Sequence, residues 1–226
     1  DRCFADVTES ALSLLSAEFE RELPAEAFGD LLEADIDNVV LVVLDGLGMD
    51  QWNRLERTVP LFRRFDAVGH VSPLTSVYPS ETAAAITTLH TGRLPAEHGL
   101  LGWHQYFESV AESIQTLPFL LEDGTPVHDV YPLANARELF AGDAIYGTAD
   151  AAGIDTHVAQ PERISNSASA QLTTAGAETN DYWNVADMAV TVRETLTDAE
   201  GPTHVTAYVP NVDHIAHITG TEDDRY

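Results

Sequence analysis

Lysine is absent from the 226-residue sequence, so all 11 basic side chains are arginines. Against them stand 37 acidic residues, which gives a net charge of −26 with histidine neutral. A surface this acidic repels nucleic acid and anionic lipid, which excludes binding of nucleic acid through a general basic surface. The composition is typical of halophilic proteins, whose carboxylates are screened from one another by concentrated salt. It therefore indicates a habitat rather than a reaction.

Cysteine is also scarce, because Cys3 is the only one. This excludes an internal disulfide and a cysteine-rich zinc site. No apolar run approaches the roughly 18 residues that a membrane span needs. No secretory leader is recognisable, which favours a cytoplasmic protein, although the chain begins at Asp1 and a leader could have been removed.

Alternating strand and helix patterns predict an α/β fold with a mostly parallel central sheet and helices on both faces. Strands are expected over residues 38–44, 67–72, 154–158 and 204–209, and helices over 6–23, 49–57, 80–91, 144–152 and 181–198. The apolar, β-branched run 38–44 predicts a strand buried on both faces. Residues 164–179 are small and polar, which indicates a loop.

Three candidate metal ligands follow predicted strands. Asp45 comes directly after residues 38–44, while Asp213 and His217 come after residues 204–209. Ligands bind beyond the carboxyl ends of strands in parallel sheets. Asp and His four residues apart can share one face of a helical turn and hold one divalent ion. Oxygen and nitrogen donors without thiolate suit zinc, and less well manganese or iron. Taken alone, Asp45 could equally cap the next helix.

Thr82 stands at the start of the predicted helix 80–91. Free backbone N–H groups and the helix dipole favour a phosphate there. A threonine hydroxyl needs a base or a metal to become a good nucleophile. An ion held by Asp45 and Thr82 would supply this activation, and a second ion on Asp213 and His217 would polarise the phosphoryl oxygen. Ser80 is the competing hydroxyl, and we interpret it as the helix cap.

These segments resemble the type I phosphodiesterase/nucleotide pyrophosphatase family of the alkaline phosphatase superfamily. The resemblance is carried, in order, by residues 44–48 (LDGLG), 78–82 (YPSET), 91–99 (TGRLPAEHG) and 213–217 (DHIAH). It implies a two-zinc site with Asp45 and Thr82 on one ion and Asp213 and His217 on the other. It also implies a covalent threonine intermediate and a small phosphoester or nucleotide substrate.

The domain division follows from the same resemblance. Residues 1–37 are expected to form an N-terminal helix and an acidic connection. Residues 38–226 would be the N-terminal part of an alkaline phosphatase-like catalytic domain, with a strand-rich insertion at 103–133.

Two departures from the family pattern bear on function. Trp103 stands where nucleotide-cleaving members often carry an asparagine, so it could stack on a base or pack, and His104 beside it is a candidate phosphate donor. The family also completes its metal site with an Asp-His pair and a further histidine, and neither has a counterpart here. We therefore expect about half of the ligands and a C-terminally incomplete fold, in a fragment, a split protein or a degenerate member.

Three functions remain open at this point. The first is a metal-dependent hydrolase that cleaves phosphodiester or pyrophosphate bonds. The second is a phosphomonoesterase of the same superfamily, and the third is a non-catalytic α/β module with an incomplete metal site. A sulfatase is excluded because no Cys/Ser-x-Pro-x-Arg segment is present.

Overall fold

A parallel sheet forms the centre of the molecule. The computed structural model describes residues 2–226, apart from the side chain of Asp66. Four strands pair in the order β1-β7-β5-β6, and each neighbouring pair is parallel. The strands are β1 (Asn38–Leu44), β5 (Asp155–Pro161), β6 (Glu178–Tyr182) and β7 (Thr203–Val209). The predicted α/β fold with a mostly parallel sheet is therefore confirmed.

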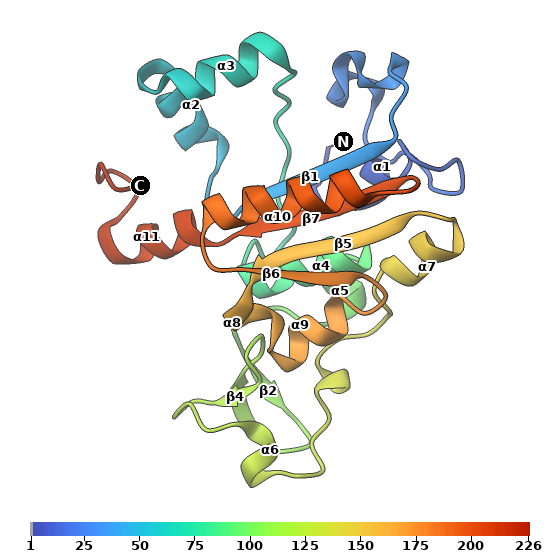
Figure 1. Cartoon of the computed structure of the whole chain (residues 1–226). Helices are drawn as coiled ribbons and strands as arrows, with labels where there is room; N and C mark the ends of the chain where they lie inside the picture. The colour runs from blue at the N-terminus through green and yellow to red at the C-terminus, as the bar shows by residue number, and fades with distance from the viewer. Residues whose placement is uncertain (1) are drawn as a thin grey trace.

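Helices cover both faces of this sheet (Figure 1). Helix α10 (Val185–Asp198) packs against one face, where Met188 joins the cluster of Ala159, Ala207 and Val209. The other face carries α1 (Val7–Leu12) and α7 (Tyr146–Ala151), whose apolar side chains surround Val158. Helix α4 (Thr82–Thr91) adjoins α1, since the Thr8 hydroxyl donates to the Leu89 carbonyl.

Strand β1 departs from the prediction that it is buried on both faces. Its side chains alternate, and Val40, Val42 and Leu44 are 37%, 49% and 40% exposed. The register pairs Val42 with Ala207 and Leu44 with Val209, which lie under α10. The three exposed side chains therefore belong to the same face of the sheet, at the edge strand.

The region before α4 contains helices where a strand was predicted. After α2 (Met49–Thr58), helix α3 (Pro60–Val68) takes up the first residues of the predicted strand 67–72, so that prediction is wrong. Pro60 at the first helical position, with its backbone already near the helical φ, favours a new helix there. Within the described residues 69–81 the only β-contact is an isolated bridge between Cys3 and Thr75.

Two further segments were misassigned. The predicted helix 6–23 ends at Leu12, because Ser13 and Ser16 hydroxyls offer the backbone local alternatives to helix; the Ser13 hydroxyl donates to the Ser10 carbonyl. The predicted loop 164–179 contains α8 (Glu162–Ser165), α9 (Ala168–Thr173) and the start of β6. The Ser167 hydroxyl caps α9 by accepting from the Ala170 N–H. Helix α10 consequently begins at Val185 instead of residue 181.

A small lobe lies beside the main body and consists of a second sheet and one short helix (Figure 1). The antiparallel strands are β2 (His104–Phe107), β3 (Glu112–Gln115) and β4 (Leu120–Leu121), followed by α6 (Val127–Val130). Helix α5 (Pro95–His98) connects α4 to this lobe. Short 3-10 segments complete the fold at Phe4–Asp6, Ala25–Ala27, Gly29–Glu33 and Ala136–Leu139. No helix within the described residues is long and apolar enough to span a bilayer.

Two buried histidines make the fold sensitive to acid. Burial lowers the pKa of both His90 and His204 from 6.5 to about 4. His90 bonds to the Tyr146 hydroxyl at 2.6 Å, whereas neither ring nitrogen of His204 has a partner among the described residues. The unfolded chain takes up these protons below about pH 6.5 and the folded chain only near pH 4, so stability falls as the pH drops through this window.

We therefore expect each buried histidine to contribute a loss of about 2 kcal/mol in the free energy of unfolding between pH 7 and pH 5. Urea unfolding at the two pH values measures this loss. Between pH 7 and pH 5, the free energy of unfolding should fall by about 2 kcal/mol less in His204→Leu than in the parent. Equal pH dependence for the parent and His204→Leu would contradict the assignment.

Candidate active site

The sheet backbone brings Asp45 and Asp213 together. Leu44 pairs with Val209 at the carboxyl ends of β1 and β7. The pairing continues past both strands, because the Asp45 N–H donates to the Val209 carbonyl at 3.0 Å and the Asp213 N–H donates to the Asp45 carbonyl at 2.9 Å. Gly46 lies directly against Asp213, and its φ of +82° is in the left-handed region that favours glycine. A Cβ on Gly46 would lie 2.6 Å from the Cα of Asp213.

Thr82 is the first residue of α4 and faces Asp45. Its hydroxyl donates to Asp45 Oδ2 at 3.4 Å. The cap of α4 is the Glu81 side chain, which accepts from the Ala83 N–H at 2.9 Å, so the interpretation of Ser80 as the cap is wrong. Glu81 thereby occupies one of the N–H groups that an incoming phosphate would use at this helix start.

Asp213 and His217 lie one turn apart on α11 (Asn211–Thr219), which follows β7. His217 Nε2 is 3.5 Å from Asp213 Oδ2. The His217 side chain is 79% exposed, and His214 between them is exposed as well. The spacing therefore does place an oxygen and a nitrogen donor on one face of a helix, at the end of the second strand.

Tyr208 is a site residue that the sequence patterns did not reveal. Its hydroxyl donates to Asp45 Oδ2 at 2.7 Å, so Asp45 accepts hydrogen bonds from two hydroxyl groups. Burial raises the pKa of Asp45, the bond from Tyr208 opposes this rise, and the nearby charge of Asp213 adds to it. In the sequence, Tyr208 is only the penultimate residue of an apolar predicted strand, where an aromatic residue is usually part of the core.

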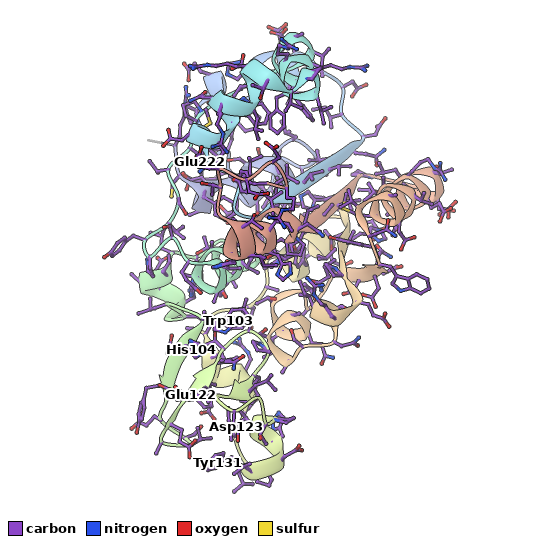
Figure 2. All side chains as sticks on the ribbon, turned by 90° about the vertical axis from the view of Figure 1, so that its left-hand side faces the viewer. Trp103, His104, Glu122, Asp123, Tyr131 and Glu222 are labelled. Atoms are coloured by element: carbon purple, nitrogen blue, oxygen red, sulfur yellow. The ribbon has the colours of Figure 1, made fainter. Side chains whose placement is uncertain are left out.

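The four candidate residues Asp45, Thr82, Asp213 and His217 line one cavity of about 600 Å³. Trp103 lines the same cavity and is 40% exposed, whereas His104, the first residue of β2, is not part of its lining. Figure 2 shows Trp103 and His104 where the small lobe meets the main body, and Tyr131 at the far end of that lobe. The fold thus brings together the four predicted ligands and Trp103, and leaves His104 outside.

The family model of type I phosphodiesterases/nucleotide pyrophosphatases matches residues 39–226. The chain belongs to this family. None of the curated protein sequences matches it. Type I phosphodiesterases/nucleotide pyrophosphatases are hydrolases that act on small phosphoesters and nucleotides, and they are typically metal-dependent.

The side-chain donors in the cavity of this type I phosphodiesterase are of the chemical types that bind a divalent ion. Carboxylate, hydroxyl and imidazole groups suit zinc, and the mutual repulsion of Asp45 and Asp213 would be relieved by a cation. Within residues 2–226, however, no three His, Cys, Asp or Glu side chains gather into one metal-binding group. Each pair of donors therefore leaves the rest of a coordination shell to water, substrate or other side chains.

Proposed function

We propose that this type I phosphodiesterase cleaves phosphodiester or pyrophosphate bonds in a metal-dependent reaction, with Thr82 as the nucleophile. The observation that carries the proposal is the hydrogen bond from the Thr82 hydroxyl to Asp45 Oδ2, in a cavity shared with Asp213 and His217. A hydroxyl at a helix start and carboxylates at two strand ends meet there, an arrangement that suits in-line phosphoryl transfer.

In the first step, Thr82 Oγ1 forms a bond to phosphorus and the bond from phosphorus to the leaving oxygen breaks. The Thr82 proton passes toward Asp45 Oδ2, which already accepts its hydrogen bond. Tyr208 donates a hydrogen bond to the same oxygen and so helps to hold the carboxylate in place. In the second step, water attacks phosphorus, the bond to Thr82 Oγ1 breaks, and the proton that water gives up restores the Thr82 hydroxyl. The proton that Asp45 received in the first step passes to the released alcohol.

Asp45 and Thr82 would hold one ion, and Asp213 with His217 the other; zinc suits these donors best. When bound, such ions supply Lewis-acid stabilisation of the attacking and leaving oxygens. Trp103 contributes an aromatic wall to the same cavity and is proposed to contact substrate. His104 lies outside the lining, and we propose no direct role for it there.

One observation favours a non-catalytic module as the second candidate. Each proposed ion has two protein donors among the described residues, short of the three that catalytic zinc sites commonly use. Such a module would keep the fold and the cavity without turnover.

Turnover assays separate these candidates. With added Zn²⁺ or Mn²⁺, bis-p-nitrophenyl phosphate should be hydrolysed faster than p-nitrophenyl phosphate. A preference for the monoester would indicate the phosphomonoesterase. Absence of turnover with either substrate, at low and high salt, would indicate the module.

The salt series in that assay matters because of the net charge of −26. We propose that the protein works in the cytoplasm of a halophilic organism, where salt screens this charge.

A further inference from the structure

The cavity extends from the phosphoryl-transfer residues toward α8 and α9. Ile164 of α8 and Ala170 of α9 line it, together with Ile86 of α4 and with Leu117 and Pro118 of the small lobe. These side chains form a mostly apolar wall. A cavity of about 600 Å³ with such a wall has the size and character of a site for an organic group.

Gln160 is one of several buried polar residues in the cavity lining, beside His90, Ser169 and Thr173. It is the sixth residue of β5 and is 3% exposed. Its Nε2 is shielded from solvent and has no hydrogen-bond partner within residues 2–226. A buried amide without a partner costs roughly 1–3 kcal/mol. Such a group is therefore expected to have a partner in the functional state of the protein.

The direction of Gln160 follows from the strand register. Ala159 pairs with Ala207 and belongs to the cluster under α10. Side chains alternate along a strand, so Gln160 points to the opposite face, toward the cavity that it lines. The same register puts it level with Tyr208, whose hydroxyl holds Asp45. Gln160 and the reacting groups thus share one face of the sheet.

A primary amide offers a donor and an acceptor side by side. It can therefore pair in two-point fashion with a planar group that presents the complementary acceptor and donor, as the edge of a nucleobase does. Trp103 lines the same cavity and is 40% exposed, and an accessible indole can stack on a flat heterocycle. The apolar wall, the aromatic ring and the amide together suit a flat heterocycle better than an alkyl or simple aryl group.

We propose that Gln160 is a specificity-determining residue, whose amide recognises the hydrogen-bonding edge of a planar heterocyclic substituent on the phosphodiester. This inference rests on the proposed phosphodiesterase function, because it assigns the organic group of that substrate.

The experiment compares two chromogenic diesters with the same leaving group, thymidine 5′-(p-nitrophenyl phosphate) and phenyl p-nitrophenyl phosphate. The parent should have the higher kcat/KM for the thymidine ester. Gln160→Leu should lower the ratio of the two kcat/KM values at least tenfold, because leucine keeps the approximate volume and removes both hydrogen bonds. Gln171→Leu is the matched control, since Gln171 lies exposed on α9 outside this cavity, and it should leave the ratio unchanged.

Calorimetric binding of thymidine 5′-monophosphate and of phenyl phosphate provides a readout that is independent of turnover. The parent should bind the nucleotide at least tenfold more tightly than phenyl phosphate, and Gln160→Leu should abolish that difference. An unchanged ratio in Gln160→Leu, in either the kinetic or the binding assay, overturns the inference. Failure of the proposed function would look different, because neither diester would then be hydrolysed while the binding comparison would still report on Gln160.

Discussion

Replacing Thr82 with alanine is expected to lower diester turnover by a factor on the order of 10³ or more, because removal of a nucleophile abolishes the covalent route. The substitution takes away Oγ1 and its hydrogen bond to Asp45, while Ala is an excellent residue for the start of a helix. Helix α4 should therefore persist. The measurement is kcat/KM for bis-p-nitrophenyl phosphate in the presence of metal, with circular dichroism to confirm the fold.

The matched variant is Thr82→Ser, which keeps a hydroxyl at the same position. It should retain substantial activity, and acid-quenched reactions with bis-p-nitrophenyl phosphate should contain a peptide that spans residue 82 and carries a p-nitrophenyl phosphoryl group. If Thr82→Ala hydrolyses the diester at the parent rate, the threonine is not the nucleophile and the proposed reaction is wrong.

Gly46→Ala is expected to damage both the fold and the proposed metal site. The new Cβ would meet the Cα of Asp213 at 2.6 Å, and backbone atoms cannot be displaced as cheaply as the end of a flexible side chain. Left-handed backbone strain and overpacking together should reduce the free energy of unfolding by about 3 kcal/mol. Movement of Asp213 should also weaken zinc binding, which a calorimetric titration would measure.

Gly99→Ala is the matched control for this prediction. Gly99 has a nearly identical φ of +79°, but a Cβ there would have no heavy atom within 4 Å. Gly99→Ala should therefore lose only about 1 kcal/mol of the free energy of unfolding, from backbone strain alone, and should leave zinc binding unchanged. Equal losses for the two variants would show that the close approach of Gly46 to Asp213 is unimportant.

The candidate site was predictable where chemistry coincides with the end of a regular element. Asp45 follows the most apolar strand of the chain, Asp213 follows the predicted strand 204–209, and Thr82 begins an uninterrupted helical run. The rule that ligands gather at the carboxyl ends of parallel strands then sufficed to group them.

The remaining features depend on tertiary contacts that no local pattern encodes. Tyr208 and Gln160 lie inside strands, where a polar residue reads as an ordinary member of the core or of a solvated face. Strand β6 escaped notice because its residues Glu178–Tyr182 are mostly polar and exposed, as an edge strand tolerates. The exposed face of β1 was missed for the reverse reason, since its apolar composition indicated full burial.

The pairing of β1 with β7 has a consequence for biosynthesis. β1 is made early and its partner late, so a ribosome must deliver most of the polypeptide before the two can pair. Contacts between such distant parts of a sequence form slowly. Until then the valines and leucines of β1 lack the strand that covers them. We therefore expect a chaperone that binds extended apolar segments to bind residues 38–44 of the nascent chain.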